Sequence, residues 1–383
     1  MAAVDVVVIG GGIVGVSTAA FLAEGGRRVR LYERSAIASG ASGRNSGIVQ
    51  HPFDPELAGL YHRTLVEYRR LADERAGSFA FPFEPAGLLL VGHDPGVARR
   101  AADAWVAAWP ATAPEVLSGG ELAALEPGLA RDLVACRLGI GFPVAPPVAT
   151  EAFAVAATGR GVEIVVGSDA RPATDGRRVI GVHVDGRIEP AGTVVVAAGP
   201  WTPSVVDLGG DWRPIRSSWG VVASVALADA PRHALEAIDI AIEPSDHAPG
   251  VDDAVDFSLV PAAGSSALGS TFLPDEPDPA AWLDALRRVG SRYVPGVAGA
   301  PLVALRSCAR PVSRDGRPLV GRAPWADGLW IVAGHGPWGI STGPGSARLV
   351  ADAILGRGAA DPIPAALAVG RFGAPEARPS PTG

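Results

Sequence analysis

The sequence of 383 residues contains no lysine, so every basic side chain other than histidine is an arginine. Without lysine the chain cannot form a Schiff base with a carbonyl compound, which excludes ordinary pyridoxal phosphate chemistry. Its two cysteines, Cys136 and Cys308, are too few for a disulfide framework or a thiolate metal site, and they suit a reducing cytoplasm. The seven histidines show neither HxH nor HExxH spacing, so no metal site is predicted.

Long apolar runs and an excess of basic charge are also missing. No uninterrupted apolar stretch approaches the ~18 residues that a membrane-spanning helix needs, so no integral membrane segment is predicted. The 33 basic residues stand against 40 acidic ones, a net charge of −7, and nucleic acid is therefore not an expected partner. The 48% of hydrophobic residues suffice for a large core and for two or three structural units.

A glycine-rich turn near the N-terminus is the most informative motif. Gly10, Gly12 and Gly15 form GxGxxG between a strand expected over 4–9 and a helix expected over 13–23, and Glu33 ends a second strand expected over 28–33. Strand, glycine turn, helix and strand form a βαβ unit that holds a dinucleotide pyrophosphate at the helix N-terminus. Glu33 would accept hydrogen bonds from an adenosine ribose, which disfavours NADP. The alternative is a glycine turn that merely joins two structural elements.

Further elements are expected along the chain from hydrophobic periodicity. Strands are predicted over 87–91, 133–140, 161–166, 193–198, 302–311 and 329–333, and helices over 57–76, 280–293 and 346–355.

Four segments in a fixed order carry a family resemblance. They are VVVIGGGIVG with Glu33, ASGRNSGIVQ at 41–50, VVVAAGPWTP at 194–203, and RPVSRDGRPLVG at 310–321 followed by GLWIVAGHGPWGIS at 328–341. Their order and spacing over residues 4–355 resemble the FAD-dependent amine and amino-acid oxidoreductases, a family that contains D-amino acid oxidase, glycine oxidase, sarcosine oxidase and D-amino acid dehydrogenase. The resemblance implies an enzyme with FAD as its cofactor.

The resemblance also implies a fold of the α/β class (α+β overall). A Rossmann-like FAD-binding domain is expected from the discontinuous segments 1–80, 145–215 and 312–383, and an inserted, mainly antiparallel substrate domain from 81–144 and 216–311. The residues expected to bind the cofactor are Gly10, Gly12, Ile13, Val14, Gly15, Glu33, Arg34, Ser42, Gly43, Arg44, Asn45, Ser46, Gly47, Ala170, Ala198, Gly199, Trp201, Cys308, Gly334, Gly336, Trp338, Gly339, Ile340 and Ser341.

Three residues are expected to act at the substrate: Arg310, His335 and Gln50. In members resembling glycine oxidase, an arginine in an RP pair binds the substrate carboxylate, and Arg310 occupies that place; the alternative is a structural arginine paired to an acid such as Asp315. His335 either adds a hydrogen bond near the flavin or is a loop histidine that faces solvent.

Two further positions compare this chain with sarcosine oxidase. Cys308 stands where its relatives join a cysteine covalently to the flavin, the alternative being an inert buried thiol. The sarcosine-binding arginine and lysine correspond to Gln50 and Ser341, and the lysine that assists reaction with oxygen corresponds to Ala267. These departures make sarcosine an unexpected substrate and leave oxygen or another compound as the electron acceptor.

The expected chemistry is oxidation of a C–N bond of a small amine or amino acid by hydride transfer to flavin N5, giving an imine that water hydrolyses. The protein would supply orientation, a dry site and charge stabilisation. One alternative is oxidation of a 2-hydroxy acid, because GRNSG also resembles hydroxyglutarate-oxidising relatives. A nicotinamide-only dehydrogenase and a flavin-containing redox or interaction module without turnover are the others.

Overall fold

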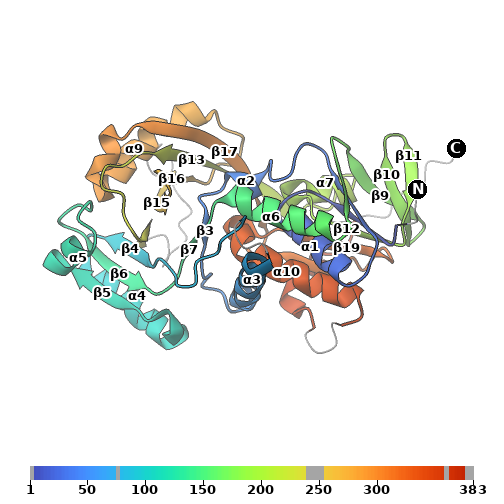
Figure 1. Ribbon diagram of the computed structural model, residues 1–383, viewed down its shortest axis with the longest axis horizontal. Helices are drawn as coiled ribbons and strands as arrows, with labels where there is room; N and C mark the ends of the chain where they lie inside the picture. Colours follow the sequence, from blue (N-terminus) through green and yellow to red (C-terminus); the bar gives the residue numbers. More distant parts are fainter. Residues whose placement is uncertain (1–3, 75–77, 239–253, 358–361, 376–383) are drawn as a thin grey trace.

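The computed structural model describes residues 4–74, 78–238, 254–357 and 362–375. Two lobes lie side by side (Figure 1). The right-hand lobe is built on a six-stranded, mostly parallel sheet, and the left-hand lobe on an eight-stranded, mostly antiparallel sheet. The expected combination of a Rossmann-like core with a separate antiparallel sheet is confirmed.

The parallel sheet has the strand order β18-β19-β12-β1-β2-β8. Its central strands are short runs of buried Val, Ile and Leu, which is typical of a parallel sheet covered on both faces. Only the edge pair β18–β19 is antiparallel. The strands are β1 Val6–Ile9, β2 Val29–Glu33, β8 Glu163–Val166, β12 Thr193–Val196, β18 Leu319–Arg322 and β19 Leu329–Ala333.

Helices cover one face of this sheet and a small sheet covers the other. On the helical face, α1 Ile13–Glu24 packs against α6 Pro146–Gly159 and α10 Gly339–Ile354, and α10 packs in turn against α3 Pro55–Glu74. The opposite face packs against a three-stranded meander, with α7 beside it. These elements are β9 Ala170–Asp175, β10 Arg178–Val184, β11 Arg187–Pro190 and α7 Thr202–Val206.

The eight-stranded sheet has the order β17-β13-β16-β15-β14-β4-β6-β5. All its described pairs are antiparallel except β14–β4. One of its faces forms an apolar core with α9 Leu283–Tyr293. The remaining elements are β4 Leu88–Gly92, α4 Pro95–Ala108, β5 Glu115–Ser118, α5 Gly119–Leu125, β6 Val134–Leu138, β13 Ile215–Val225, β14 Ala234–Ala237, β15 Val255–Ala262, β16 Ser265–Thr271 and β17 Leu302–Ser313.

A narrow ribbon joins the lobes. It pairs β3 Ile48–Val49 with β7 Phe142–Pro143 and lies between the two large sheets (Figure 1). We propose the two-domain division expected from the sequence, in which β13 and β17 run across the boundaries near 215 and 311.

Helix α10 begins at Gly339. The helix was predicted over 346–355, so its predicted start was wrong. Its first turns read GISTGPG and include Pro344, a composition that argues against a helix. Packing explains the difference, because a Cβ at Gly345 would lie 2.2 Å from the Leu60 carbonyl oxygen on α3. The glycines therefore let α3 and α1 approach α10 closely.

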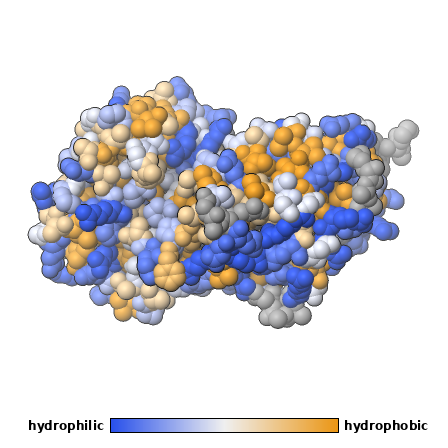
Figure 2. Space-filling view, in the orientation of Figure 1, coloured by the Kyte–Doolittle hydropathy of each residue, from blue (hydrophilic) through white to orange (hydrophobic). Residues whose placement is uncertain are grey.

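Charged side chains join the helices at the surface. Figure 2 shows a hydrophilic band over the lower part of the right-hand lobe, in the region of α3. There Arg348 donates to Glu67 over 2.8 Å, Arg160 to Glu74 over 2.6 Å, and Arg70 pairs with Glu24. The Arg70 bond contributes to holding the pKa of Glu24 at about 2, against the opposing effect of burial. None of the described helices is long and apolar enough to cross a membrane.

Candidate functional site

The glycine turn between β1 and α1 is shaped by close backbone contacts. Gly10 has φ +117°, and a Cβ there would lie 2.4 Å from the Ala197 carbonyl oxygen at the end of β12. A Cβ at Gly15 would lie 1.9 Å from the Gly10 carbonyl oxygen. Both positions require glycine for the packing of α1 on the sheet. Gly12 differs, because its nearest contact would be the Ser42 hydroxyl at 3.0 Å.

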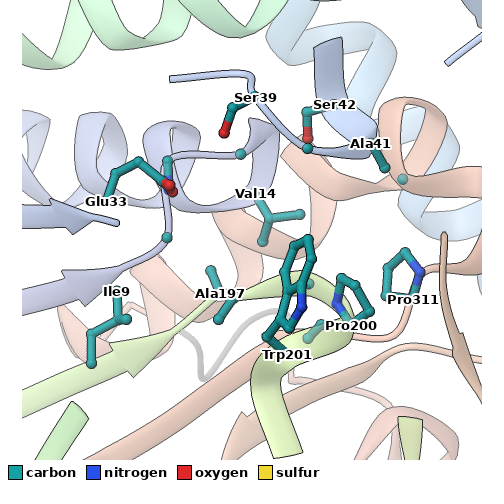
Figure 3. A pocket seen from close by; sticks show the side chains of 18 of the residues that line it. Ile9, Val14, Glu33, Ser39, Ala41, Ser42, Ala197, Pro200, Trp201 and Pro311 are labelled. Carbon is teal, nitrogen blue, oxygen red and sulfur yellow. The ribbon is translucent and has the colours of Figure 1, made fainter. Parts of the chain in front are cut away.

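Two polar side chains bond to the backbone of this turn. Glu33, at the end of β2, accepts from the Gly11 amide over 2.6 Å and from the Ser35 amide over 2.8 Å. Ser42 accepts from the Ile13 amide over 2.9 Å, and α1 has no acidic residue in its first turn. Backbone N–H groups at a helix N-terminus form an anion-binding position. Figure 3 shows Glu33, Ser39 and Ser42 around this end of the site.

A cavity of about 620 Å³ extends from this turn toward β17. Its walls come from the carboxyl ends of β1, β2, β8, β12 and β19, where ligands bind in open α/β sheets. The expected site residues that line it are Gly10, Gly12, Ile13, Val14, Glu33, Arg34, Ser42, Arg44, Asn45, Ala170, Ala198, Gly199, Trp201, Cys308, Arg310, His335, Gly336, Gly339 and Ile340.

Other expected residues lie outside this cavity lining: Gly15, Gly43, Ser46, Gly47, Gln50, Gly334, Trp338 and Ser341. Asn45 and Gly47 shape the chain between α2 Ala41–Arg44 and β3, since Asn45 Oδ1 accepts from the Gly47 amide over 2.9 Å. Gly47 has φ +87°, a conformation that favours glycine.

Sequence reasoning missed several lining residues, including Ser168, Asp169 and Arg171. They follow β8, which adjoins β2 in the sheet, so the position of β8 was the signal that could have found them. It also missed Arg306, which donates to the carbonyl oxygens of Arg44 (2.9 Å) and Asn45 (3.0 Å). Arg306 thereby ties the segment after α2 to β17.

An arginine–tryptophan stack forms part of the cavity wall. The guanidinium of Arg34, directly after β2, lies 4.0 Å from the ring centre of Trp201, which follows β12. Figure 3 shows Trp201 and Pro200 on the side of the cavity opposite Glu33. Such a planar pair offers a surface on which an aromatic ring can stack.

Arg310 lines the far end of the cavity. It donates to the Thr271 carbonyl oxygen over 2.7 Å and to the Ser270 hydroxyl, and its guanidinium lies 4.4 Å from the ring centre of Phe272. Burial lowers its pKa from the usual value. Arg310 forms no ion pair with Asp315, because Asp315 accepts from Arg371 over 2.8 and 3.0 Å.

His335 lies in the cavity wall and is 2% exposed, so the alternative of a solvent-facing loop histidine is wrong. Its Nε2 lies 3.0 Å from the Ser346 hydroxyl, which itself donates to the Thr342 carbonyl oxygen. Because that hydroxyl proton is used, we assign the imidazole proton to Nε2. Burial lowers the pKa of His335 to about 3, so the ring is neutral.

The stability of the fold should depend on this neutral state. Because the folded-state pKa is depressed, the contribution of His335 is fully present above the ordinary pKa of 6.5 and is lost as pH falls toward about 3. As the pH falls from 6.5 toward about 3, the difference in unfolding free energy between the wild type and His335→Gln should therefore shrink by about 1.4 kcal/mol per pH unit.

Urea unfolding at several pH values tests this expectation. His183→Gln is a matched control, because His183 is exposed on β10, and it should follow the wild type at every pH. A wild type and a His335→Gln variant with parallel pH profiles would contradict the assignment.

Gln50 and Ser341, the two positions that correspond to the sarcosine-binding arginine and lysine, lie in contact. The backbone N–H of Gln50 donates to the Ser341 hydroxyl over 2.9 Å. The Gln50 side chain points elsewhere, and its Nε2 donates to Glu236 on β14 over 3.1 Å. No local sequence pattern indicated Glu236, because its position depends on the pairing of β14 in the large sheet.

Cys308 is buried in the cavity wall. Burial raises the pKa of its thiol, an effect that Arg310, Arg306 and Arg44 only partly offset. Since the thiolate is the nucleophile, we expect no bond between Cys308 and the flavin. Acid precipitation should give a colourless pellet and a yellow supernatant, and Cys308→Ser should keep the wild-type flavin content. A yellow pellet that turns colourless in Cys308→Ser would contradict this expectation.

The whole arrangement agrees with the comparison to known families. The model of the FAD dependent oxidoreductases matches residues 5–353. The chain belongs to this family. It is therefore an enzyme, and its cofactor is FAD. In the described residues no group of three or more histidine, cysteine or acidic side chains is placed to hold a metal ion.

Similar proteins of this FAD-dependent oxidoreductase family span most of the chain. A glycine oxidase of Pseudomonas aeruginosa is 29% identical over 365 residues, 92% of this chain and 95% of the relative. A D-amino acid dehydrogenase of Xylella fastidiosa is 29% identical over 253 residues, 63% of this chain but 55% of the relative, so the match spans about half of that protein. The structure of glycine oxidase from Geobacillus kaustophilus superposes with a TM-score of 0.82 at 23% identity, covering 97% and 99% of the two chains, and shows the same fold.

Proposed function

We propose that this chain is an amino-acid oxidase or dehydrogenase that oxidises the C–N bond of a small amino acid to an imine, which hydrolyses to a keto product. The observation that carries the proposal is Arg310, a guanidinium at the cavity wall that bonds to Thr271 and Ser270. No carboxylate partner of Arg310 occurs among the ion pairs of the described ranges. The names of the relatives, glycine oxidase and D-amino acid dehydrogenase, support the substrate class.

The cavity residues fit FAD, and we propose which of them hold it. The Gly12 turn and the N-terminus of α1 would bind the pyrophosphate, because they present backbone N–H groups where side chains are absent. Glu33 would bind the ribose, and Arg34 with Trp201 would stack near the adenine. The bound flavin would supply the electron-accepting chemistry.

Arg310 would orient the substrate. Its planar guanidinium can bind a carboxylate through two parallel hydrogen bonds, which fixes the direction of the α-hydrogen. The contacts with Thr271, Ser270 and Phe272 hold the guanidinium in place before substrate binds. The neutral His335 would keep its proton on Nε2, so it would act as a hydrogen-bonding group and not as a cation.

An anaerobic screen tests the proposed function. The FAD-loaded enzyme is mixed with D-, L- and N-methyl amino acids and with 2-hydroxy acids, and bleaching of the flavin absorbance is followed. We expect amino acids with a free carboxylate to bleach the flavin. Bleaching by hydroxy acids alone would establish the alternative C–O oxidation, and no bleaching by any compound would favour a module without turnover. Because both cysteines are free and buried, we also propose a cytoplasmic location.

A further inference from the structure

One face of the eight-stranded sheet carries polar side chains across several strands. Strand pairing sets Arg310 opposite Ser218, Cys308 opposite Gly220, and Ser258 opposite both Gly269 and Glu236. The alternating residues, such as Val221, Leu259 and Leu235, lie in the core under α9. We call the first set the polar face; it comprises Ser218, Gly220, Glu236, Ser258, Gly269, Cys308 and Arg310, together with Asp256, which alternates along β15 with the core residues Val255, Phe257 and Leu259.

The charge of Arg310 lies away from its own strand. A Cβ at Gly220 on β13 would lie 2.3 Å from both Nη atoms of Arg310, so the guanidinium rests directly on Gly220. From there it reaches β16, where it bonds to Thr271 and Ser270. The side chain of Arg310 starts on β17 and crosses β13, so its charge lies next to β16. Strand β15 is the next strand of the sheet.

Two acidic residues continue this line across the polar face. Asp256 lies on β15 and Glu236 on β14, the next two strands in the sheet. Adjacent strands are about 4.8 Å apart, so β14 lies about 10 Å across the sheet from β16, the strand to which the Arg310 guanidinium is bonded. Because β15 lies between β16 and β14, Asp256 stands on the strand between the one that holds the Arg310 guanidinium and the one that carries Glu236.

Glu236 has little in its surroundings to stabilise a negative charge. Gln50 donates to it over 3.1 Å, and within the described ranges no arginine or histidine forms an ion pair with it. Burial and Asp256 raise its pKa to about 7. A partly buried carboxylate with an acidic neighbour and no cation costs stability, and such groups concentrate at functional sites.

We propose that Glu236 determines the substrate class by binding a second, cationic group of an amino acid whose α-carboxylate is bound by Arg310. The inference rests on the proposed function and assigns it basic amino acids such as lysine, ornithine or arginine. A side chain of four methylene groups, with bonds of about 1.5 Å, spans most of the ~10 Å between β16, where the Arg310 guanidinium is bonded, and β14, which carries Glu236.

Matched pairs of substrates test the inference. Flavin reduction by lysine is compared with reduction by norleucine, which has the same carbon chain without the ω-ammonium group, in both enantiomers. We expect a kcat/KM at least about 10-fold higher for lysine, since a charge-assisted hydrogen bond contributes on this scale. In Glu236→Gln the ratio should fall toward one. Glu115→Gln is the control, because Glu115 lies on the edge strand β5 and pairs with Arg137.

The outcomes separate the two proposals. A wild type that reduces norleucine as fast as lysine overturns the role of Glu236 and leaves amino-acid oxidation standing, and this comparison needs no variant to fold. An unchanged ratio in an FAD-loaded Glu236→Gln enzyme also overturns that role alone. Failure of every amino acid to bleach the flavin overturns both proposals.

Discussion

Replacing Gly12 with valine should yield a folded protein that no longer retains FAD. A Cβ at Gly12 would meet only the Ser42 hydroxyl, at 3.0 Å, so the backbone tolerates the first carbon atom. The two further methyl groups would fill the space beside the N-terminus of α1, where the pyrophosphate needs to approach the backbone. Flavin absorbance relative to protein absorbance after gel filtration should fall to the background.

Gly12 is a sharper test than the other glycines of the motif. Substitution of Gly10 or Gly15 would drive a side chain into backbone atoms of the fold itself, so cofactor loss there would not separate binding from folding. Gly59→Val is a matched control, because an added Cβ at this exposed position in α3 meets nothing within 4 Å. Full flavin occupancy in Gly12→Val would contradict the position assigned to the pyrophosphate.

Local sequence patterns were sufficient to predict the strands of the parallel sheet except β18. Short runs of Val and Ile next to glycine turns located β1, β2, β12 and β19 to within two residues at each end. These elements form from near neighbours in sequence, and burial on both faces demands an apolar run whatever the tertiary partners. The glycine turn was also predicted from a local pattern, because GxGxxG lies between a strand and a helix.

Features that depend on distant pairing were not predictable in this way. The start of α10 depends on how closely α3 and α1 pack on Gly343 and Gly345. Helix propensities describe single residues, so they do not predict this tertiary packing. The contact of Gln50 with Glu236 joins residues 186 positions apart. The resemblance to a known family was able to indicate Arg310, because that residue stands in a continuous motif.

Arg310→Ala should lower kcat/KM for amino acids by about 30-fold or more while the protein stays folded and yellow. Removing one partner of a buried charge-assisted pair costs about 2 to 5 kcal/mol, and about 1.4 kcal/mol corresponds to a factor of ten. The guanidinium donates to no carboxylate in the described ranges, and its hydrogen bonds go to the Thr271 carbonyl oxygen and the Ser270 hydroxyl. Loss of the side chain should therefore weaken substrate binding far more than the fold.

The matched control for this variant is Arg314→Ala. Arg314 is exposed, follows β17 directly, and donates to the Arg213 carbonyl oxygen over 3.0 Å, so its removal should leave kcat/KM unchanged. A substrate analogue with a neutral amide in place of the carboxylate should react slowly with the wild type and lose little further in Arg310→Ala. If Arg310→Ala releases FAD or unfolds, the residue is structural. If a folded, flavin-loaded variant keeps wild-type kcat/KM for carboxylate substrates, another group binds the carboxylate and the amino-acid assignment loses the observation that carries it.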